Sequence, residues 1–241
     1  MSGMHSFAAL SAPAVVGAFD LSFARRMLDL GGATGALAAA ACEAYPALAE
    51  AVVVDLPHVV ELAQQHFAPG AGGAAGAGVG AEAGGDAGEK AGGGGGSGDG
   101  AGVPGEGSGG ASCCGGRLRW LAADFFTESD KLPQQVDLVV LSRILHDWDA
   151  PRCAQLLALA HGLLRPGGAV LLAEMLLQPD RLGPPAALLQ DLNMLCQTHG
   201  RERSLAEYGE LLGSAGFVEV RGRVTGTYLD AVLAHKPEQC E

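Results

Sequence analysis

The chain has 241 residues and a formal net charge of −12, and 38 of its residues are glycine. This acidic balance disfavours a nucleic-acid partner, because phosphate binding needs clustered Lys and Arg side chains. No apolar run reaches the length of a membrane span, and the six cysteines form no CxxC motif or Cys/His cluster. The composition therefore predicts a protein without structural zinc or disulfides, and we expect it in the cytoplasm.

Short apolar runs alternate with helical patterns along the chain, as in a doubly wound α/β sheet. The predicted strands cover 27–30, 51–54, 118–121, 136–141 and 169–173, followed by an antiparallel closing pair over 217–224 and 228–235. The first predicted helix follows the first strand and ends near residue 46. The others cover 57–67, 149–164, 185–197 and 205–215. The expected fold class is α/β, with a doubly wound, mostly parallel, seven-stranded Rossmann-like sheet whose last strand is antiparallel.

The helix before the fifth strand has the clearest predicted boundaries. Asp149 is a candidate N-cap, and Pro151 occupies the first turn, where its missing N–H costs nothing. The sequence Arg165-Pro166-Gly167-Gly168 predicts the helix end, with glycine in the left-handed conformation and proline blocking continuation.

Three regions differ in composition. Residues 1–25 are expected to form a short linker helix, and 26–236 the main domain. Residues 69–116 interrupt that domain with a low-complexity Gly/Ala segment, which cannot bury enough apolar surface to offset its ordering entropy. We therefore predict a disordered insertion there, which is tolerable because loop-closure entropy grows slowly with length.

A glycine-rich turn follows the first strand, with the sequence Asp29-Leu30-Gly31-Gly32-Ala33-Thr34-Gly35. A turn between a strand and a helix presents backbone N–H groups to a ligand, and glycine allows the ligand to approach closely. The GxGxxG dinucleotide pattern fails, because its second and third glycines would be Ala33 and Ala36. A nicotinamide dehydrogenase is therefore disfavoured, and an amino-acid/nucleoside ligand fits better.

Acidic residues follow the next two strands. Asp55 lies 20 residues after Gly35, where its carboxylate can accept ribose hydroxyls, although a helix N-cap is an alternative role. Asp124 and Phe125 follow the third strand and suit an adenine ring, with a solvated turn acid and a core aromatic as the alternative. Because open α/β sheets bind ligands at the carboxyl ends of their strands, the combination predicts one nucleoside site.

His146 lies at the same edge, in the segment 142–148 after the fourth strand. An isolated histidine is usually structural, but this one is flanked by acidic and aromatic residues and is expected to face the ligand. Glu174, at the end of the fifth strand, and Glu202 are candidates to orient its imidazole. We therefore interpret His146 as a candidate general base.

Taken together, these residues resemble the class I S-adenosylmethionine-dependent O-methyltransferases of the acetylserotonin and caffeate type. The most specific matching segments are 29–37, 124–126, 143–148, 165–168, 192–195 with Gln197, and 201–204. The resemblance implies S-adenosylmethionine as cofactor, no metal, and a small phenolic or indolic hydroxyl compound as methyl acceptor. The residue roles that it implies are cofactor contacts from Gly31, Asp55, Asp124, Phe125 and Arg143, His146 as base flanked by Glu174 and Glu202, and substrate contacts from Asp147, Asn193 and Gln197.

Two departures from the family pattern matter. Only about 25 residues precede the first strand, where the family has a helical domain for dimerisation and substrate closure, so a homodimer and full activity are in question. Ala33 replaces a common glycine, a minor change if its φ is negative and its methyl points away from the ligand. The alternative function is a catalytically weak or inactive S-adenosylmethionine-binding paralogue that acts as an interaction module.

Overall fold

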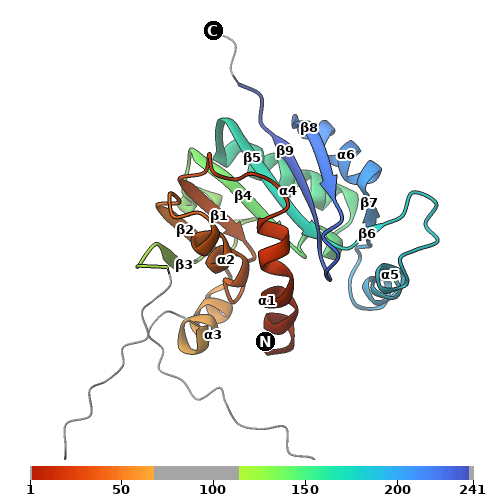
Figure 1. Ribbon diagram of the computed structural model, residues 1–241, viewed down its shortest axis with the longest axis horizontal. Helices are drawn as coiled ribbons and strands as arrows, with labels where there is room; N and C mark the ends of the chain where they lie inside the picture. The colour runs from red at the N-terminus through yellow and green to blue at the C-terminus, as the bar shows by residue number, and fades with distance from the viewer. Residues whose placement is uncertain (1, 68–113, 239–241) are drawn as a thin grey trace, which may run out of the picture. The chain divides into compact units, whose positions relative to one another are not determined.

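The computed structural model describes residues 2–67 and 114–238 and contains a seven-stranded sheet of order β3-β2-β1-β4-β5-β9-β8 (Figure 1). Its strands are β1 (Arg26–Leu30), β2 (Glu50–Asp55), β3 (Leu118–Ala122), β4 (Val136–Ser142), β5 (Leu164–Glu174), β8 (Val218–Arg223) and β9 (Asp230–His235). The first five in sequence are parallel, whereas β9 pairs antiparallel with both β5 and β8. The predicted fold class is confirmed.

Helices cover both faces of this sheet. They are α1 (Ser2–Val16), α2 (Ala36–Ala44), α3 (Pro57–Phe67), α4 (Ala150–Leu163), α5 (Pro185–Gln197) and α6 (Leu205–Ser214), with the 3-10 turns η1 (Ser129–Lys131) and η2 (Leu145–Asp147). Successive strand residues alternate between two cores: Met27 packs with the α1 and α2 side chains, and Leu28 with those of α4 and α6. Burial on both faces explains why the central strands are almost continuously apolar.

The two ends of α4 differ in how well the sequence predicts them. Asp149 is the N-cap, and its Oδ1 accepts a hydrogen bond from the Arg152 backbone N–H at 3.0 Å. The predicted glycine stop is wrong, because the helix ends at Leu164, whose backbone is extended. Leu164 is fully buried and pairs with Val136, so sheet pairing ends the helix, and Gly167, at φ +72°, lies inside β5.

A second, two-stranded sheet was not predicted. It pairs β6 (Leu176–Leu177) in parallel with β7 (Arg203–Ser204). Because β6 follows β5 almost immediately, this pairing brings the segment around residue 203 to the carboxyl end of β5.

The remaining predictions concern the chain's outer segments. The proposed insertion at 69–116 lies outside the described residues, except for 114–116, which form a turn. The described residues belong to one compact unit. Among them, no helix combines the length and apolar character needed to cross a bilayer.

Arg117 fixes the point where the described chain resumes. Its guanidinium donates hydrogen bonds to the carbonyls of Cys42 at 2.7 Å, Leu48 at 2.8 Å and Tyr45 at 3.2 Å, and to that of Cys114 at 3.1 Å. Two of these carbonyls, those of Cys42 and Tyr45, lie at the end of α2, where helix carbonyls lack intrahelical partners and attract a cation.

We predict that Arg117→Met lowers the free energy of unfolding by about 2–4 kcal/mol, because several part-buried carbonyls lose a charged donor. Urea denaturation measures the loss. Arg119→Met is the matched control two residues along β3, since Arg119 forms an exposed ion pair with Glu50 at 2.9 Å. Such a pair contributes less than about 1 kcal/mol, and equal losses in the two variants would contradict the prediction.

Candidate active site

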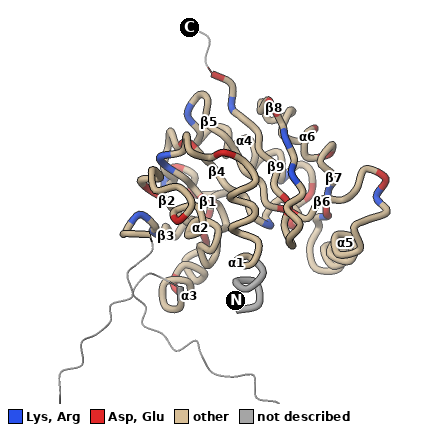
Figure 2. Tube along the Cα trace, viewed as in Figure 1, with Lys and Arg blue, Asp and Glu red and all other residues tan. Residues whose placement is uncertain are grey.

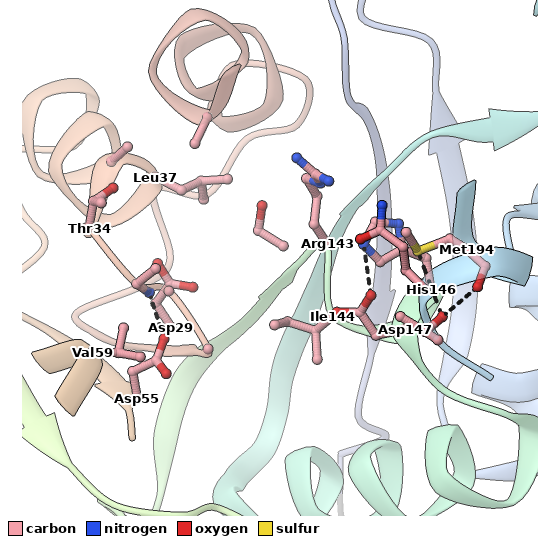
Figure 3. A pocket seen from close by; sticks show the side chains of 18 of the residues that line it. Asp29, Thr34, Leu37, Asp55, Val59, Arg143, Ile144, His146, Asp147 and Met194 are labelled. Atoms are coloured by element: carbon pink, nitrogen blue, oxygen red, sulfur yellow. Dashed lines mark hydrogen bonds and ion pairs between the residues drawn. The ribbon is translucent and has the colours of Figure 1, made fainter. Parts of the chain in front are cut away.

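A cavity of about 470 Å³ lies at the carboxyl ends of the parallel strands (Figure 3). The predicted residues that line it are Gly31, Asp55, Arg143, His146, Asp147, Asn193 and Gln197. Asp29, Thr34 and Asp55 gather on one side, and His146, Asp147 and Met194 on the other, with Arg143 between the two groups (Figure 3). The structure therefore joins the glycine turn and the candidate base in one cavity.

The glycine turn needs its glycines for close approach. Gly31 has φ +73°, and a Cβ there would lie 2.3 Å from Ile144 Cδ1. A Cβ on Gly32 would lie 2.4 Å from Asp29 Oδ2. Gly35, at φ +74°, is the N-cap of α2, so the turn leads directly into a helix N-terminus.

Ala33 does not have the negative φ under which its replacement of glycine would be a minor change. Its φ is +45°, not negative, and an alanine in this left-handed region carries a cost of about 1 kcal/mol. Two contacts hold it there: its N–H donates to Asp55 Oδ2 at 3.0 Å, and its carbonyl accepts from Trp120 Nε1 at 3.1 Å. The substitution of glycine by alanine is therefore compensated by the neighbours of this peptide unit.

Two acidic residues, Asp55 and Asp29, line the cavity next to the glycine turn. Besides Ala33, Asp55 accepts a hydrogen bond from the Leu56 N–H at 2.8 Å. Asp29 is 1% exposed, and neither of its carboxylate oxygens has a hydrogen-bond partner among the described residues. Burial, with a smaller contribution from Asp55, raises the pKa of Asp29 to about 7. Asp29 was not assigned a ligand contact from the sequence, although its place at the start of the glycine pattern was visible.

Asp124 and Phe125 do not line the cavity. Asp124 Oδ1 accepts a hydrogen bond from the Phe126 N–H at 2.9 Å, and the Phe125 and Phe126 rings lie 5.0 Å apart. Phe125 still lies near the turn, because its Cε1 is 3.9 Å from the position of a Cβ on Gly31. Their contacts with a cofactor stay predictions.

Arg143 projects between the two halves of the cavity from a strained position. Its φ is +56°, and its N–H donates to the Ala173 carbonyl at 2.9 Å. Its Nε is buried and has no hydrogen-bond partner among the described residues. A part-buried guanidinium whose Nε has no partner favours an anionic group of a ligand.

His146 lies in η2 and is 2% exposed. Its Nδ1 is hydrogen-bonded to Glu202 Oε1 at 2.7 Å and lies 3.8 Å from Glu174 Oε2. Its Nε2 lies 3.6 Å from Oδ1 of Asp147, a part-buried carboxylate of the cavity wall. Burial by itself lowers the pKa of the imidazole, but the carboxylates outweigh it, and the pKa of His146 is raised.

The backbone of η2 is held from two sides. Glu174 Oε1 accepts hydrogen bonds from the N–H groups of Ile144 at 3.1 Å and Leu145 at 2.9 Å. The buried Arg203 donates to the carbonyls of Leu145 and Trp148, each at 2.8 Å. Glu174 thus has two functions, to fix the turn and to face the imidazole, and Arg203 is a positioning residue that the sequence did not reveal.

The three residues His146, Glu174 and Glu202 also place potential metal-ligating atoms within 4.8 Å of one another. However, Nδ1 and Glu202 are already joined by a direct hydrogen bond, and Glu174 Oε1 is occupied by two backbone N–H groups. The group is therefore organised around the imidazole.

The far wall of the cavity comes from α5. Gln197 Nε2 donates to Asn193 Oδ1 at 2.5 Å, and the neighbouring Met194 is 4% exposed. This wall combines two amide side chains with an apolar one, as is typical of pockets that bind small organic ligands.

The sheet order and the glycine turn after β1 define the class I, Rossmann-like methyltransferase fold. The sequence pattern of the O-methyltransferase domain family matches residues 1–80 and 112–218, and the chain belongs to this family.

Individual relatives agree with this family. The chain is 39% identical to acetylserotonin O-methyltransferase of Gallus gallus, over 98% of this chain and 55% of the relative. It is 36% identical to 3-hydroxy-5-methyl-1-naphthoate 3-O-methyltransferase of Streptomyces sahachiroi, over 91% of this chain and 50% of the relative. The crystal structure of human N-acetylserotonin methyltransferase in complex with SAM matches with a TM-score of 0.75 and 33% identity, over 98% of this chain and 54% of that one. The chain thus spans about half the length of these relatives.

Gly200 was also missed by the sequence analysis. A Cβ there would lie 1.9 Å from the His146 carbonyl oxygen and 2.5 Å from the Asp147 carbonyl carbon. We predict that Gly200→Ala displaces η2 and lowers the free energy of unfolding by about 1–3 kcal/mol, because the backbone must shift to admit the methyl group. Chemical denaturation measures the loss, and the NMR signals of the His146 ring report the displacement.

Gly209→Ala is the matched control for this substitution. Gly209 lies inside α6, and a Cβ there meets no atom within 4 Å. The same methyl group should therefore stabilise the protein by about 0.5–1 kcal/mol. A neutral or stabilising Gly200→Ala would show that Gly200 does not constrain the turn.

Asp29 gives a prediction on pH. Because its pKa is raised to about 7 in the folded state, the folded protein keeps a proton that the unfolded chain releases between about pH 4 and 7. Its contribution to stability therefore falls as the pH rises through this window. We predict that Asp29→Asn raises the free energy of unfolding at pH 8 by on the order of 2–4 kcal/mol, with little effect at pH 4.

Urea denaturation at pH 4, 5 and 8 tests this difference. Asp20→Asn is the control, since the pKa of the exposed Asp20 is lowered by its hydrogen bonds with Ser22. Asp20 is ionised in both states from pH 5 to 8, so this variant should show no change across that range. A pH-independent effect of Asp29→Asn would mean that Asp29 is ionised in the folded protein.

Proposed function

We propose that the chain is the methyl-transferring domain of an S-adenosylmethionine-dependent O-methyltransferase whose acceptor is the hydroxyl group of a small aromatic compound, either a phenol or an acetylserotonin-like indole. One observation carries the proposal. The buried imidazole of His146, held by Glu202 at 2.7 Å, opens onto the same cavity as the glycine turn after β1. Together they would provide a methyl-donor site and a general base at the same edge of the sheet.

The donor half fits the chemical groups of S-adenosylmethionine. Its amino-acid part carries an ammonium and a carboxylate group, and the cavity offers the unpaired oxygens of Asp29 and the unpaired Nε of Arg143. Asp55 would accept the ribose hydroxyls, and Gly31 allows the ligand to approach the backbone. Asp124 and Phe125 would contact the adenosine part from the edge of the site. When bound, the cofactor supplies an electrophilic methyl group.

His146 would serve as the general base. With Nδ1–H directed to Glu202, the lone pair of Nε2 is available to accept the proton of the attacking hydroxyl group. Glu174 and Glu202 stabilise the imidazolium that forms, consistent with the raised pKa of His146. In the overall reaction the hydroxyl oxygen gains a bond to the methyl carbon, and the carbon–sulfur bond breaks with its electron pair on sulfur.

The acceptor half would be formed by Asp147, Asn193 and Gln197, whose polar groups orient the aromatic compound. Alignment of the oxygen, carbon and sulfur atoms would supply most of the rate enhancement, for which roughly 7–11 kcal/mol is available. The mechanism needs no metal, since acid–base chemistry and alignment account for it.

Two further proposals concern the surroundings of the protein. Its net charge is −12, and its Lys and Arg residues are dispersed over several elements (Figure 2), which favours neither DNA nor RNA as a partner. The cysteine pattern favours the cytoplasm as its location. A homodimer is a separate proposal, since the chain spans only 55% of its chicken relative. The oligomeric state in solution would test it.

His146→Ala tests the proposed reaction. Calorimetry should show S-adenosylmethionine binding in both the natural protein and the variant, while turnover of N-acetylserotonin or simple phenols falls by about 10²–10⁴-fold. In the natural protein, kcat/KM should rise with pH through the raised pKa of His146, because only the neutral imidazole accepts a proton.

His161→Ala is the control, because His161 lies on α4 beside Phe217, outside the cavity lining. Full turnover by His146→Ala would overturn the assignment of the base. Cofactor binding without turnover in the natural protein would favour a binding paralogue, and binding of NAD in place of S-adenosylmethionine would overturn the proposed function.

A further inference from the structure

Near the His146 turn, three buried oxygens share one property. Glu174 Oε2, Glu202 Oε2 and the Tyr208 hydroxyl have no hydrogen-bond partner among the described residues. Each of these residues is at most 1% exposed. Tyr208 packs in the same core cluster as Leu145, which precedes His146. Buried polar atoms in folded proteins are nearly always hydrogen-bonded, so three unpaired oxygens around this turn indicate a shared partner.

Tyr208 is fixed in this cluster by the start of α6. The N-cap Ser204 and Glu207 form a capping box, which sets the first turn of the helix. Burial, with the negative charges of Glu174 and Glu202, raises the pKa of Tyr208 well above its ordinary range. Its hydroxyl therefore stays neutral and keeps one proton to donate.

The other donors of the cluster are already used. The Ile144 and Leu145 N–H groups bind Glu174 Oε1, and His146 Nδ1 binds Glu202 Oε1. When both groups are ionised, the two Oε2 atoms accept hydrogen bonds only, so one tyrosine proton cannot serve both of them. A water molecule that accepts from the hydroxyl and donates to both carboxylates satisfies all three oxygens.

The separation of the two carboxylates suits one water molecule. Ligating atoms of His146, Glu174 and Glu202 all lie within 4.8 Å of one another. Two hydrogen bonds of about 2.8 Å each can span that separation. A water with three polar partners also matches the coordination typical of buried waters in proteins.

We propose that Tyr208 is a positioning residue for His146: through one buried water, its hydroxyl keeps Glu174 and Glu202 ionised and directed at the imidazole. Burial, with the negative charge of Glu202, raises the pKa of Glu174 to about 7, and a donor on its free oxygen opposes that shift. The inference rests on the proposed role of His146 as the base. Tyr208 itself does not line the cavity.

The electrostatic consequence depends on every charged or titratable group around His146. These are Asp147 and Arg143 after β4, Cys153 on α4, Glu174 on β5, Asp191 on α5, Glu202 and Arg203 at β7, and Tyr208 on α6. Tyr208 differs from the others because it alone in this group pairs a neutral donor with a complete lack of partners in the described part of the chain. Loss of its proton donor would weaken the negative charge that supports the imidazolium, so the pKa of His146 should fall.

Tyr208→Phe tests this in the full chain, because it removes one oxygen atom and leaves the ring. The titration midpoint of His146, followed by NMR of the ring nitrogens without substrate or cofactor, should fall by about half a pH unit or more. Circular dichroism checks that the fold is unchanged. A midpoint equal to that of the natural protein would overturn the proposal and leave Tyr208 a packing residue.

Tyr45→Phe is the matched control. The Tyr45 hydroxyl donates to the carbonyls of Phe19 at 3.0 Å and Val16 at 3.2 Å, away from His146. This variant also loses a hydroxyl group, but the midpoint of His146 should not move. An equal shift in both variants would mean that the effect is a general response to destabilisation, and the proposal would fail.

A high-resolution crystal structure of the natural protein gives a second measurement that does not depend on the variant folding. A water peak within hydrogen-bond distance of all three oxygens is expected. No peak there, or a metal ion identified by anomalous scattering, would overturn the proposal. If the midpoint shifts as expected but no methyl acceptor is turned over, the proposed function fails and the link between Tyr208 and His146 stands.

Discussion

The burial of two carboxylates around one imidazole is the constraint on which the site depends. Glu174 and Glu202 are almost completely removed from water, and each would be costly to bury without partners. The protein compensates with backbone N–H groups on Glu174 and with the ring of His146 on Glu202. The turn that carries His146 is therefore fixed by the requirement that these carboxylates be satisfied.

That constraint also explains why a small second sheet matters. Glu202 lies 56 residues beyond His146 in the sequence, and the pairing of β6 with β7 brings its segment to the end of β5. Gly200 permits the close passage of this segment over the His146 turn, and Arg203 binds the carbonyls of that turn. A two-residue strand pair, unimportant for the main core, thus completes the surroundings of the base.

The donor half of the cavity is stabilised differently. Ala33 and Arg143 both have positive φ angles, and each is held by hydrogen bonds to a neighbouring strand or side chain. Backbone strain of this kind persists where the surrounding structure fixes it, and it is common at binding sites. The glycine turn lines one side of the cavity, and the amide side chains of α5 line another.

The sequence by itself determined the order of strands and helices, because hydrophobic periodicity and capping residues such as Asp149 act locally. It also indicated the glycine turn and His146, since strand ends of a parallel sheet meet at one edge. Seven of the eleven predicted site residues line the cavity, and Glu174 Oε2 lies 3.8 Å from the His146 imidazole.

Only the tertiary structure decided the rest, because it depends on contacts between residues far apart in the chain. Sheet pairing of Leu164 overrode the glycine signal at the end of α4, and Asp55 with Trp120 held Ala33 at a positive φ. Asp29 is buried in the folded protein, while Asp124 accepts a hydrogen bond from the nearby Phe126 N–H. Hydrogen-bond satisfaction in a dry interior is a property of the assembled fold, and no local pattern in the sequence encodes it.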